Sequence, residues 1–331
     1  MQPADVIATP EFSRRTLLAA GALLAVPRAA FAQSEASSPS SSMLKVAIFS
    51  KHLQFLRGED LAKGAKEIGF DGVDISVRKG GHVEPDVVTQ DLPKLAEMIR
   101  ANGLQVPMIT TDIVDDKSPY AEAVLRTASE LGIRHYRWGG LKYNNQQPIP
   151  EQLNAMKPRV AGLAALNKRY GVCAMYHTHS GIGVVGAPIW DLHILLSDFD
   201  PNAVAVNYDV GHATVEGGLG GWIDSFRVTG PYLKGIAVKD FLWEKNEKGR
   251  WEPAWQPLGK GMVHFHQFFG MVRDAHFAGP LQLHFEYPLG GANSGKTTIT
   301  IPREEVFAAM KRDLTTLRGY LSEAGLAAQI L

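Results

Sequence analysis

Short apolar runs alternate with longer helical stretches along the chain, and this alternation limits the fold more than any other feature of the sequence. The predicted strands are residues 45–49, 72–76, 105–109, 135–138, 172–177, 204–209, 235–239 and 282–286. The predicted helices include residues 92–101, 120–131, 150–170, 189–196, 264–276 and 303–324. Strands that alternate with helices are joined by crossovers and run parallel. The pattern therefore predicts a single-domain (β/α)8 TIM barrel.

An open, doubly wound parallel sheet is the competing architecture. Such a sheet would be expected to carry a glycine-rich phosphate loop directly after its first strand. The segment at that position is Ser50-Lys51-His52-Leu53, which is not such a loop. The closed barrel is therefore favoured.

Residues 1–32 have the features of a twin-arginine signal peptide. Arg14 and Arg15 precede an apolar stretch over residues 18–26, and Ala30-Phe31-Ala32 supplies the small residues that signal peptidase requires. Cleavage after Ala32 leaves a serine-rich linker over residues 33–42 and no membrane anchor. The mature protein is therefore expected in the periplasm.

Composition excludes several classes of function for the remaining residues, 43–331. Their number suits a TIM barrel, which typically needs about 250 residues. The chain has 34 basic and 34 acidic residues, so no basic excess favours nucleic acid as a partner. Cys173 is the only cysteine, which excludes an intramolecular disulfide and a cysteine-based metal cluster. A homo-oligomer is left open.

Ionisable residues concentrate where the predicted strands end. TIM barrels carry their chemistry at the carboxyl-terminal ends of the strands. Six of the eight strands end at or near such residues: Arg78, His82, Arg137, His177, His179, Asp209, His212, Lys239, Asp240 and Glu286. Since side chains alternate along a strand, many of these are expected to face one pocket. Carboxylates and imidazoles there favour one divalent metal ion, namely Mn, Mg, Co or Zn.

Three short motifs, in order, carry a resemblance to a known family. Asp209-Val210-Gly211-His212 follows one strand, Lys239-Asp240 ends the next, and Glu286 ends the last. In this respect the chain resembles the xylose-isomerase-like barrels, which include sugar epimerases, inosose dehydratases and DNA repair endonucleases. The resemblance implies that Asp209 and Glu286 bind a metal and that His212 contacts substrate.

Two positions depart from the family pattern. His177 stands where the family's first metal-binding glutamate is expected, and Ala237 stands where a histidine ligand is expected. The predicted metal ligands are therefore Asp209 and Glu286, with His177 or His179 completing the set. Lys239 is the alternative source of positive charge.

Either arrangement predicts removal of a proton next to a carbonyl, with a cation stabilising the enediolate. Glu286 is the predicted general base, and His177 or Lys239 the acid opposite it. The alternative interpretation is structural, with Asp209 capping a turn and Glu286 forming an ion pair with Lys239.

Further residues are predicted to contact a carbohydrate substrate. Arg78 and Arg137 suit sugars and sugar acids, although both are also candidates for a lid or for contacts between helices. His82 lies in a glycine-containing loop. Residues 240–262 form a long connection whose Trp243 is predicted to stack on a sugar ring, and packing of this loop onto the barrel is the alternative.

The leading hypothesis is an exported sugar isomerase or epimerase with metal-assisted proton abstraction. One alternative is a lyase or dehydratase acting on a keto-sugar, a 3-keto-glycoside or an inosose. The other is a periplasmic carbohydrate-binding barrel without catalytic activity.

Overall fold

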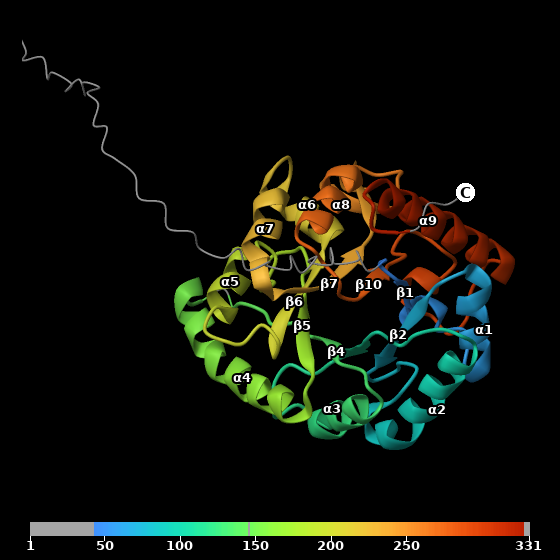
Figure 1. Cartoon of the computed structure of the whole chain (residues 1–331). Helices are drawn as coiled ribbons and strands as arrows, with labels where there is room; N and C mark the ends of the chain where they lie inside the picture. Colours follow the sequence, from blue (N-terminus) through green and yellow to red (C-terminus); the bar gives the residue numbers. More distant parts are fainter. Residues whose placement is uncertain (1–42, 145, 328–331) are drawn as a thin grey trace, which may run out of the picture. The chain divides into compact units, whose positions relative to one another are not determined.

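Eight parallel strands close into a barrel in the computed structural model, which describes residues 43–144 and 146–327. In order around the ring the strands are β1 (Val46–Phe49), β10 (Leu281–Leu283), β7 (Leu233–Val238), β6 (Val204–Asp209), β5 (Cys173–His177), β4 (His135–Trp138), β3 (Ile109–Thr111) and β2 (Gly72–Val77). Helices surround this ring (Figure 1). The predicted single-domain TIM barrel is confirmed, while the predicted signal peptide and linker lie outside the described residues.

The helices follow the strands in chain order. They are α1 (Gly58–Ile68), α2 (Val88–Ala101), α3 (Ala121–Glu130), α4 (Ile149–Tyr170), α5 (Trp190–Leu196), α6 (Val210–Gly217), α7 (Gly221–Thr229), α8 (Phe265–Asp274) and α9 (Arg303–Glu323). Short 3-10 turns are η1 (Ser50–Leu53), η2 (Pro85–Val87), η3 (Gly230–Tyr232) and η4 (Ala292–Ser294). Within the described ranges, none of these helices has both the length and the apolar character required to cross a bilayer.

Strand boundaries follow the sequence closely except at β3 and at β10, which ends at Leu283 rather than at the predicted residue 286. Strands β4 and β6 begin and end at the predicted residues. Strand β3 overlaps its prediction only at Ile109, and Gln105 makes an isolated bridge to Gly72 instead. Pro107 lies between them and has no N–H to donate, so a regular ladder cannot start before it.

Side-chain alternation divides each strand between the helical layer and the barrel interior. On β2, Val73, Ile75 and Val77 pack into the large core formed with the helices. Asp74 and Ser76 share the opposite, inward face. A separate apolar cluster of Met108, Cys173, Met175 and Ala205 fills the interior, and polar residues follow it toward the carboxyl ends of the strands.

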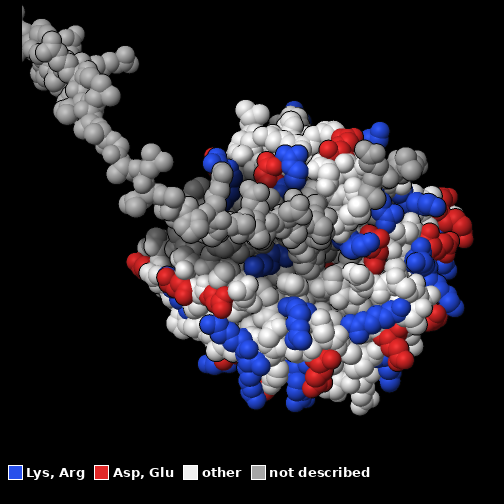
Figure 2. Space-filling model, viewed as in Figure 1, with Lys and Arg blue, Asp and Glu red and all other residues white. Residues whose placement is uncertain are grey.

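The long connection after β7 is an antiparallel hairpin rather than an irregular loop. It consists of β8 (Asp240–Lys245) and β9 (Trp251–Gln256). Asp240 holds the base of the hairpin, because its carboxylate accepts main-chain N–H bonds from Gly259 (3.0 Å), Gly261 (2.8 Å) and Val263 (3.2 Å). Outside the barrel mouth, the face drawn in Figure 2 carries side chains of both charges.

The fully buried Asn167 supplies a test of the packing between α4 and the barrel. Its Oδ1 accepts from the Tyr136 hydroxyl, and its Nδ2 donates to the carbonyl of Ala203, both at 2.8 Å. Asn167→Ala leaves the buried Tyr136 hydroxyl without its acceptor and removes one of the two donors to the Ala203 carbonyl, so we expect the free energy of unfolding to fall by about 1–3 kcal/mol. Urea unfolding measures this. The exposed Asn202→Ala is the control, and equal losses for both variants would contradict the assignment.

Candidate active site

The ammonium group of Lys239 lies at the centre of the charged residues at the carboxyl-terminal mouth of the barrel. Its side chain is only 2% exposed. Nζ donates to Nε2 of His212 at 2.7 Å and to Oε2 of Glu286 at 3.1 Å. Oδ2 of Asp209 lies 3.2 Å from Nζ, and the Trp255 ring centroid lies 4.4 Å from it. One buried cation is therefore shared by two carboxylates, an imidazole and an aromatic face.

Strand order explains why residues far apart in the sequence meet at this point. In the β6–β7 register Asp209 pairs with Ala237, so Lys239 lies two residues further along the same face. On the other side of β7, Gln282 of β10 pairs with Ala237, and Glu286 follows four residues later. The closed ring thus brings the ends of β6, β7 and β10 together around one lysine.

The two carboxyl groups beside Lys239 have pKa values shifted in opposite directions. Burial raises the pKa of Asp209 to about 6, although Lys239 opposes the shift. Burial also acts to raise the pKa of Glu286, but Lys239 and Lys51 outweigh it and hold that pKa well below its usual range. Nζ of Lys51 lies 3.6 Å from Oε1 of Glu286. Glu286 is consequently a carboxylate near neutral pH, while Asp209 takes up a proton just below it.

Asp209 also caps the helix that follows it. Its Oδ1 accepts the main-chain N–H of His212 at 3.0 Å, at the start of α6. Asp209 therefore caps α6 through Oδ1 and faces Lys239 through Oδ2.

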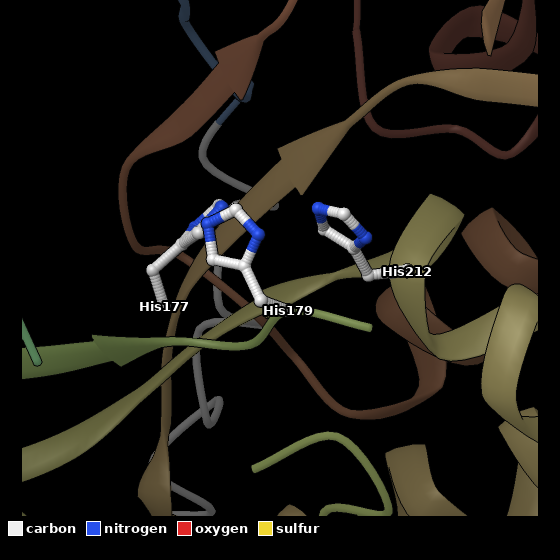
Figure 3. A group of neighbouring side chains, drawn as sticks. All are labelled: His177, His179 and His212. Atoms are coloured by element: carbon white, nitrogen blue, oxygen red, sulfur yellow. The ribbon is translucent and has the colours of Figure 1, made fainter. Parts of the chain in front are cut away.

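Histidine rings gather beside this group of charges. His177 and His179 extend from the end of β5, and His212 faces them from the start of α6 (Figure 3). The ring centroids of His179 and His212 are 4.4 Å apart, and those of His177 and His284 are 5.4 Å apart. Burial holds the pKa of His177, His212 and His284 well below the usual range and lowers that of His179 to about 3. The rings are therefore neutral at pH 7, and each neutral imidazole has one nitrogen with a lone pair, which in His212 faces Lys239 and in His179 faces Arg137.

Part of this cluster has the donor atoms of a metal site. Nε2 of His177, Oδ2 of Asp209 and Nδ1 of His284 are buried and lack a hydrogen-bond partner among the described residues. The first two atoms are 3.5 Å apart, and one ligand atom of each of the three residues lies within 4.8 Å of the others. His177, His179 and His212 form a second group of this size. Two imidazoles and a carboxylate suit a borderline divalent cation.

Asn207 controls which nitrogen of His177 is available. Its Nδ2 lies 3.1 Å from Nδ1 of His177, while its buried Oδ1 has no partner among the described residues. With the side-chain amide in this orientation, the imidazole proton lies on Nε2 and faces Asp209. If the amide is reversed, its oxygen accepts a hydrogen bond from Nδ1–H of His177, and Nε2 has a free lone pair that can bind a metal. Asn207 therefore fits both tautomers of His177.

Arg78 and Arg137 lie on the opposite side of the mouth from Lys239. Nη2 of Arg137 contacts Nε2 of His179 at 3.0 Å, and the guanidinium of Arg78 lies 5.3 Å from the Phe49 ring centroid. Both groups face the residues described above rather than the helical layer.

The other two predicted substrate residues are engaged elsewhere. The ring of His82 contacts the carbonyl of Leu56 (3.1 Å) and the hydroxyl of Ser76 (3.3 Å), which ties its loop to the barrel. Trp243 lies on the hairpin with its ring 5.9 Å from that of Phe241. Trp255, paired with Phe241 across the hairpin, is the tryptophan that contacts Lys239.

Sequence reasoning missed Lys51, His284 and Trp255. Lys51 follows β1 directly, so the rule that selected the other strand ends also applies to it. His284 lies two residues before Glu286, so alternation along the strand places the two on one face. Trp255 could not be separated from Trp243 and Trp251 without the hairpin register.

The chain is similar to known proteins in sequence pattern and in fold. A sequence model described as xylose isomerase-like TIM barrel matches residues 62–309, which is more than half of the chain. No protein among the curated sequences matches the chain.

Solved structures share the fold at low sequence identity. A D-tagatose 3-epimerase-like protein is 12% identical with a TM-score of 0.65, covering 85% of this chain and 98% of its own. D-Psicose 3-epimerase from Clostridium cellulolyticum H10, solved with D-tagatose, is 14% identical with a TM-score of 0.62, covering 84% and 99%. A 3-keto-D-glucoside 4-epimerase from E. coli is 14% identical with a TM-score of 0.58, covering 83% and 99%. These similar structures are of sugar epimerases or epimerase-like proteins.

The raised pKa of Asp209 predicts a specific dependence of stability on pH. The carboxyl ionises near pH 4 when unfolded and near pH 6 when folded, so the folded state holds its proton more tightly. Relative to Asp209→Asn, the wild-type free energy of unfolding is therefore highest below about pH 4. It falls by about 3 kcal/mol as the pH rises through about 6. Urea unfolding across this range measures the difference.

The exposed Asp224→Asn is the matched control and should follow the wild type at every pH. Parallel curves for the wild type and Asp209→Asn would show that Asp209 has an ordinary pKa.

Proposed function

The chain belongs to the xylose isomerase-like TIM barrel family, and we propose that it is a sugar isomerase or epimerase that removes a proton next to a carbonyl. The observation that carries this proposal is the shared position of the Lys239 ammonium, within 3.2 Å of both Asp209 and Glu286. The names of the similar structures, which are epimerases of small sugars and of a keto-glucoside, support the substrate class.

Lys239 supplies a fixed positive charge for the oxygen of the developing enediolate. An ammonium group that is already buried and oriented needs little reorganisation when negative charge develops on the substrate. Its hydrogen bonds to His212 and Glu286 hold it at the mouth of the barrel. Trp255 covers the other side of the ammonium and offers an apolar face to a sugar ring.

Glu286 is the proposed base. Its side chain is 20% exposed, so substrate can reach it, and its lowered pKa keeps it ionised. The same lysine that lowers its pKa also limits its basicity. As negative charge develops on the enediolate oxygen, it shares the Lys239 charge with the carboxylate, whose interaction with the lysine weakens and whose basicity rises.

Lys239, which lies beside Glu286, is the proposed acid that donates a proton to the enediolate oxygen, and His212 relays the replacement proton to it. His212 accepts from Lys239 at Nε2, and its Nδ1 lies 2.8 Å from the hydroxyl of Ser180. The three groups form a continuous chain of hydrogen bonds from the reacting position toward solvent.

His177, Asp209 and His284 would hold a divalent metal. When bound, the metal would polarise the substrate carbonyl and offset the charge of the enediolate. Of the ligands predicted from the sequence, this assignment retains Asp209 and His177. It gives Glu286 the role of base, since two ammonium groups already surround that carboxylate. Export to the periplasm by the twin-arginine pathway remains part of the proposal.

Metal content tests the ligand assignment. After incubation with Mn, Co or Zn, the purified protein is expected to hold about one equivalent of metal. Asp209→Asn, His177→Ala and His284→Ala should each lower the affinity by about 10–100-fold or more, while Glu286→Gln should retain the metal. His193→Ala, an exposed histidine on α5, is the control. A metal-free wild type would leave Lys239 as the only electrophile.

Exchange of carbon-bound hydrogen in D2O tests the reaction. With a nitrophenyl 3-keto-glucoside as probe, the wild type is expected to incorporate deuterium next to the carbonyl. Lys239→Met and Glu286→Gln should slow exchange by about 10²–10⁴-fold, because each removes a group that acts in the transition state. Lys248→Met, on the exposed tip of the hairpin, should exchange at the wild-type rate.

Release of nitrophenol together with exchange would identify the lyase alternative instead. Binding of the probe without exchange or release would identify the non-catalytic carbohydrate-binding alternative.

A further inference from the structure

Two guanidinium groups rise on either side of β3. Arg137 of β4 pairs with Thr110 of β3, and Thr110 pairs with Ser76 of β2. Arg78 lies two residues beyond Ser76 and therefore on the same inward face. Around the closed ring, β3 is the strand opposite β7, so this pair faces Lys239 across the mouth.

Neither group is neutralised by direct contact with a carboxylate among the described residues. Arg137 contacts only a neutral imidazole, that of His179, through Nη2 at 3.0 Å, and Arg78 lies over the ring of Phe49. Other arginines of the chain do have such partners: Arg159 lies 2.8 Å from Asp115 and Arg318 lies 3.3 Å from Asp71. Arg57, Arg100 and Arg134 also lack a carboxylate partner, but they are exposed, whereas Arg78 and Arg137 are partly buried.

The electrostatics of the pair favour an anion between them. Burial lowers the pKa of Arg137 to about 10, and repulsion by Arg78 adds to this shift. A buried carboxyl that acts on Arg137 is that of Asp74, which accepts a hydrogen bond from Thr110 at 2.7 Å. Burial raises the pKa of Asp74 to about 7, so it neutralises only part of the charge. A ligand anion would relieve the repulsion that remains.

A carboxylate fits this position better than a phosphate. Phosphate sites rely heavily on main-chain N–H groups at helix starts and loops. The loop after β2 has its N–H groups occupied: Gly80 donates to Glu84 (2.7 Å), Gly81 to the carbonyl of Arg78 (2.8 Å) and His82 to the carbonyl of Ser76 (3.0 Å). Guanidinium groups bind either anion bidentately, so the lack of these N–H donors is what favours the carboxylate, which two arginines can bind unaided.

We propose that the substrate is a sugar acid of the hexuronate type, with its terminal carboxylate bound by Arg78 and Arg137 and its carbonyl at Lys239. This inference rests on the proposed function, which supplies the position of the reacting carbonyl. A six-carbon acid carries the two groups at opposite ends, as the opposed positions of β3 and β7 require.

Binding of D-glucuronate and D-glucose to the mature protein tests the proposal, since the two differ at the terminal carbon. Calorimetric titration is expected to show D-glucuronate binding about 10-fold or more tightly than D-glucose. Arg78→Gln and Arg137→Gln should each remove this preference. Arg134→Gln, an exposed arginine at the other end of β4, is the control and should keep the preference. Thermal unfolding verifies that each variant is folded.

Equal affinities for the two sugars, or a preference that survives both substitutions, would overturn the proposal. Tighter, arginine-dependent binding of D-glucose 6-phosphate than of D-glucuronate would overturn it in favour of a phosphate ester.

Failure of the proposed function has a different signature. Arginine-dependent binding of D-glucuronate by a protein that exchanges no carbon-bound hydrogen would support the acid site and reject the isomerase. Exchange of carbon-bound hydrogen by a protein that binds D-glucuronate no more tightly than D-glucose would do the reverse.

Discussion

The ammonium group of Lys239 is almost completely buried, and the charges at the barrel mouth are arranged around it. Transfer of a lysine charge out of water is costly unless other groups compensate it. Asp209, Glu286 and His212 supply that compensation from the ends of three neighbouring segments. The lysine in turn prevents the two carboxylates from repelling each other at close range. Removal of Lys239 would leave Asp209 and Glu286 without the cation that they share.

The same lysine separates the properties of its two carboxylate partners. Asp209 is fully buried, so burial outweighs the lysine and its pKa is raised. Glu286 is partly exposed and has Lys51 as a second ammonium partner, so its pKa is lowered. Two residues of similar chemistry thereby become suited to different tasks, one to bind a cation in a buried cluster and one to act on substrate at the surface of the site.

The fold was predictable because each strand and helix can be recognised from the pattern of apolar residues within its own segment. Strands β4 and β6 begin and end where hydrophobic alternation placed them, and the predicted residues at strand ends do lie at the mouth of the barrel. The hairpin after β7 was not predicted, because its strands are mostly polar and exposed and its pairing depends on Asp240 anchoring main-chain groups about twenty residues away. For the same reason Trp255 could not be distinguished from the other tryptophans of that segment.

The sequence by itself determined the barrel and which chemical groups finish its strands, since both follow from periodicity along the chain. Only the tertiary structure decided how those groups are paired. Lys239 and Glu286 are 47 residues apart, and they meet because closure of the ring sets β10 beside β7. Closure of the ring likewise brings His284 beside His177 and Arg137 beside His179. Hydrogen bonds and ion pairs act over a few ångströms, so they depend on distances between strands that no single segment of sequence contains.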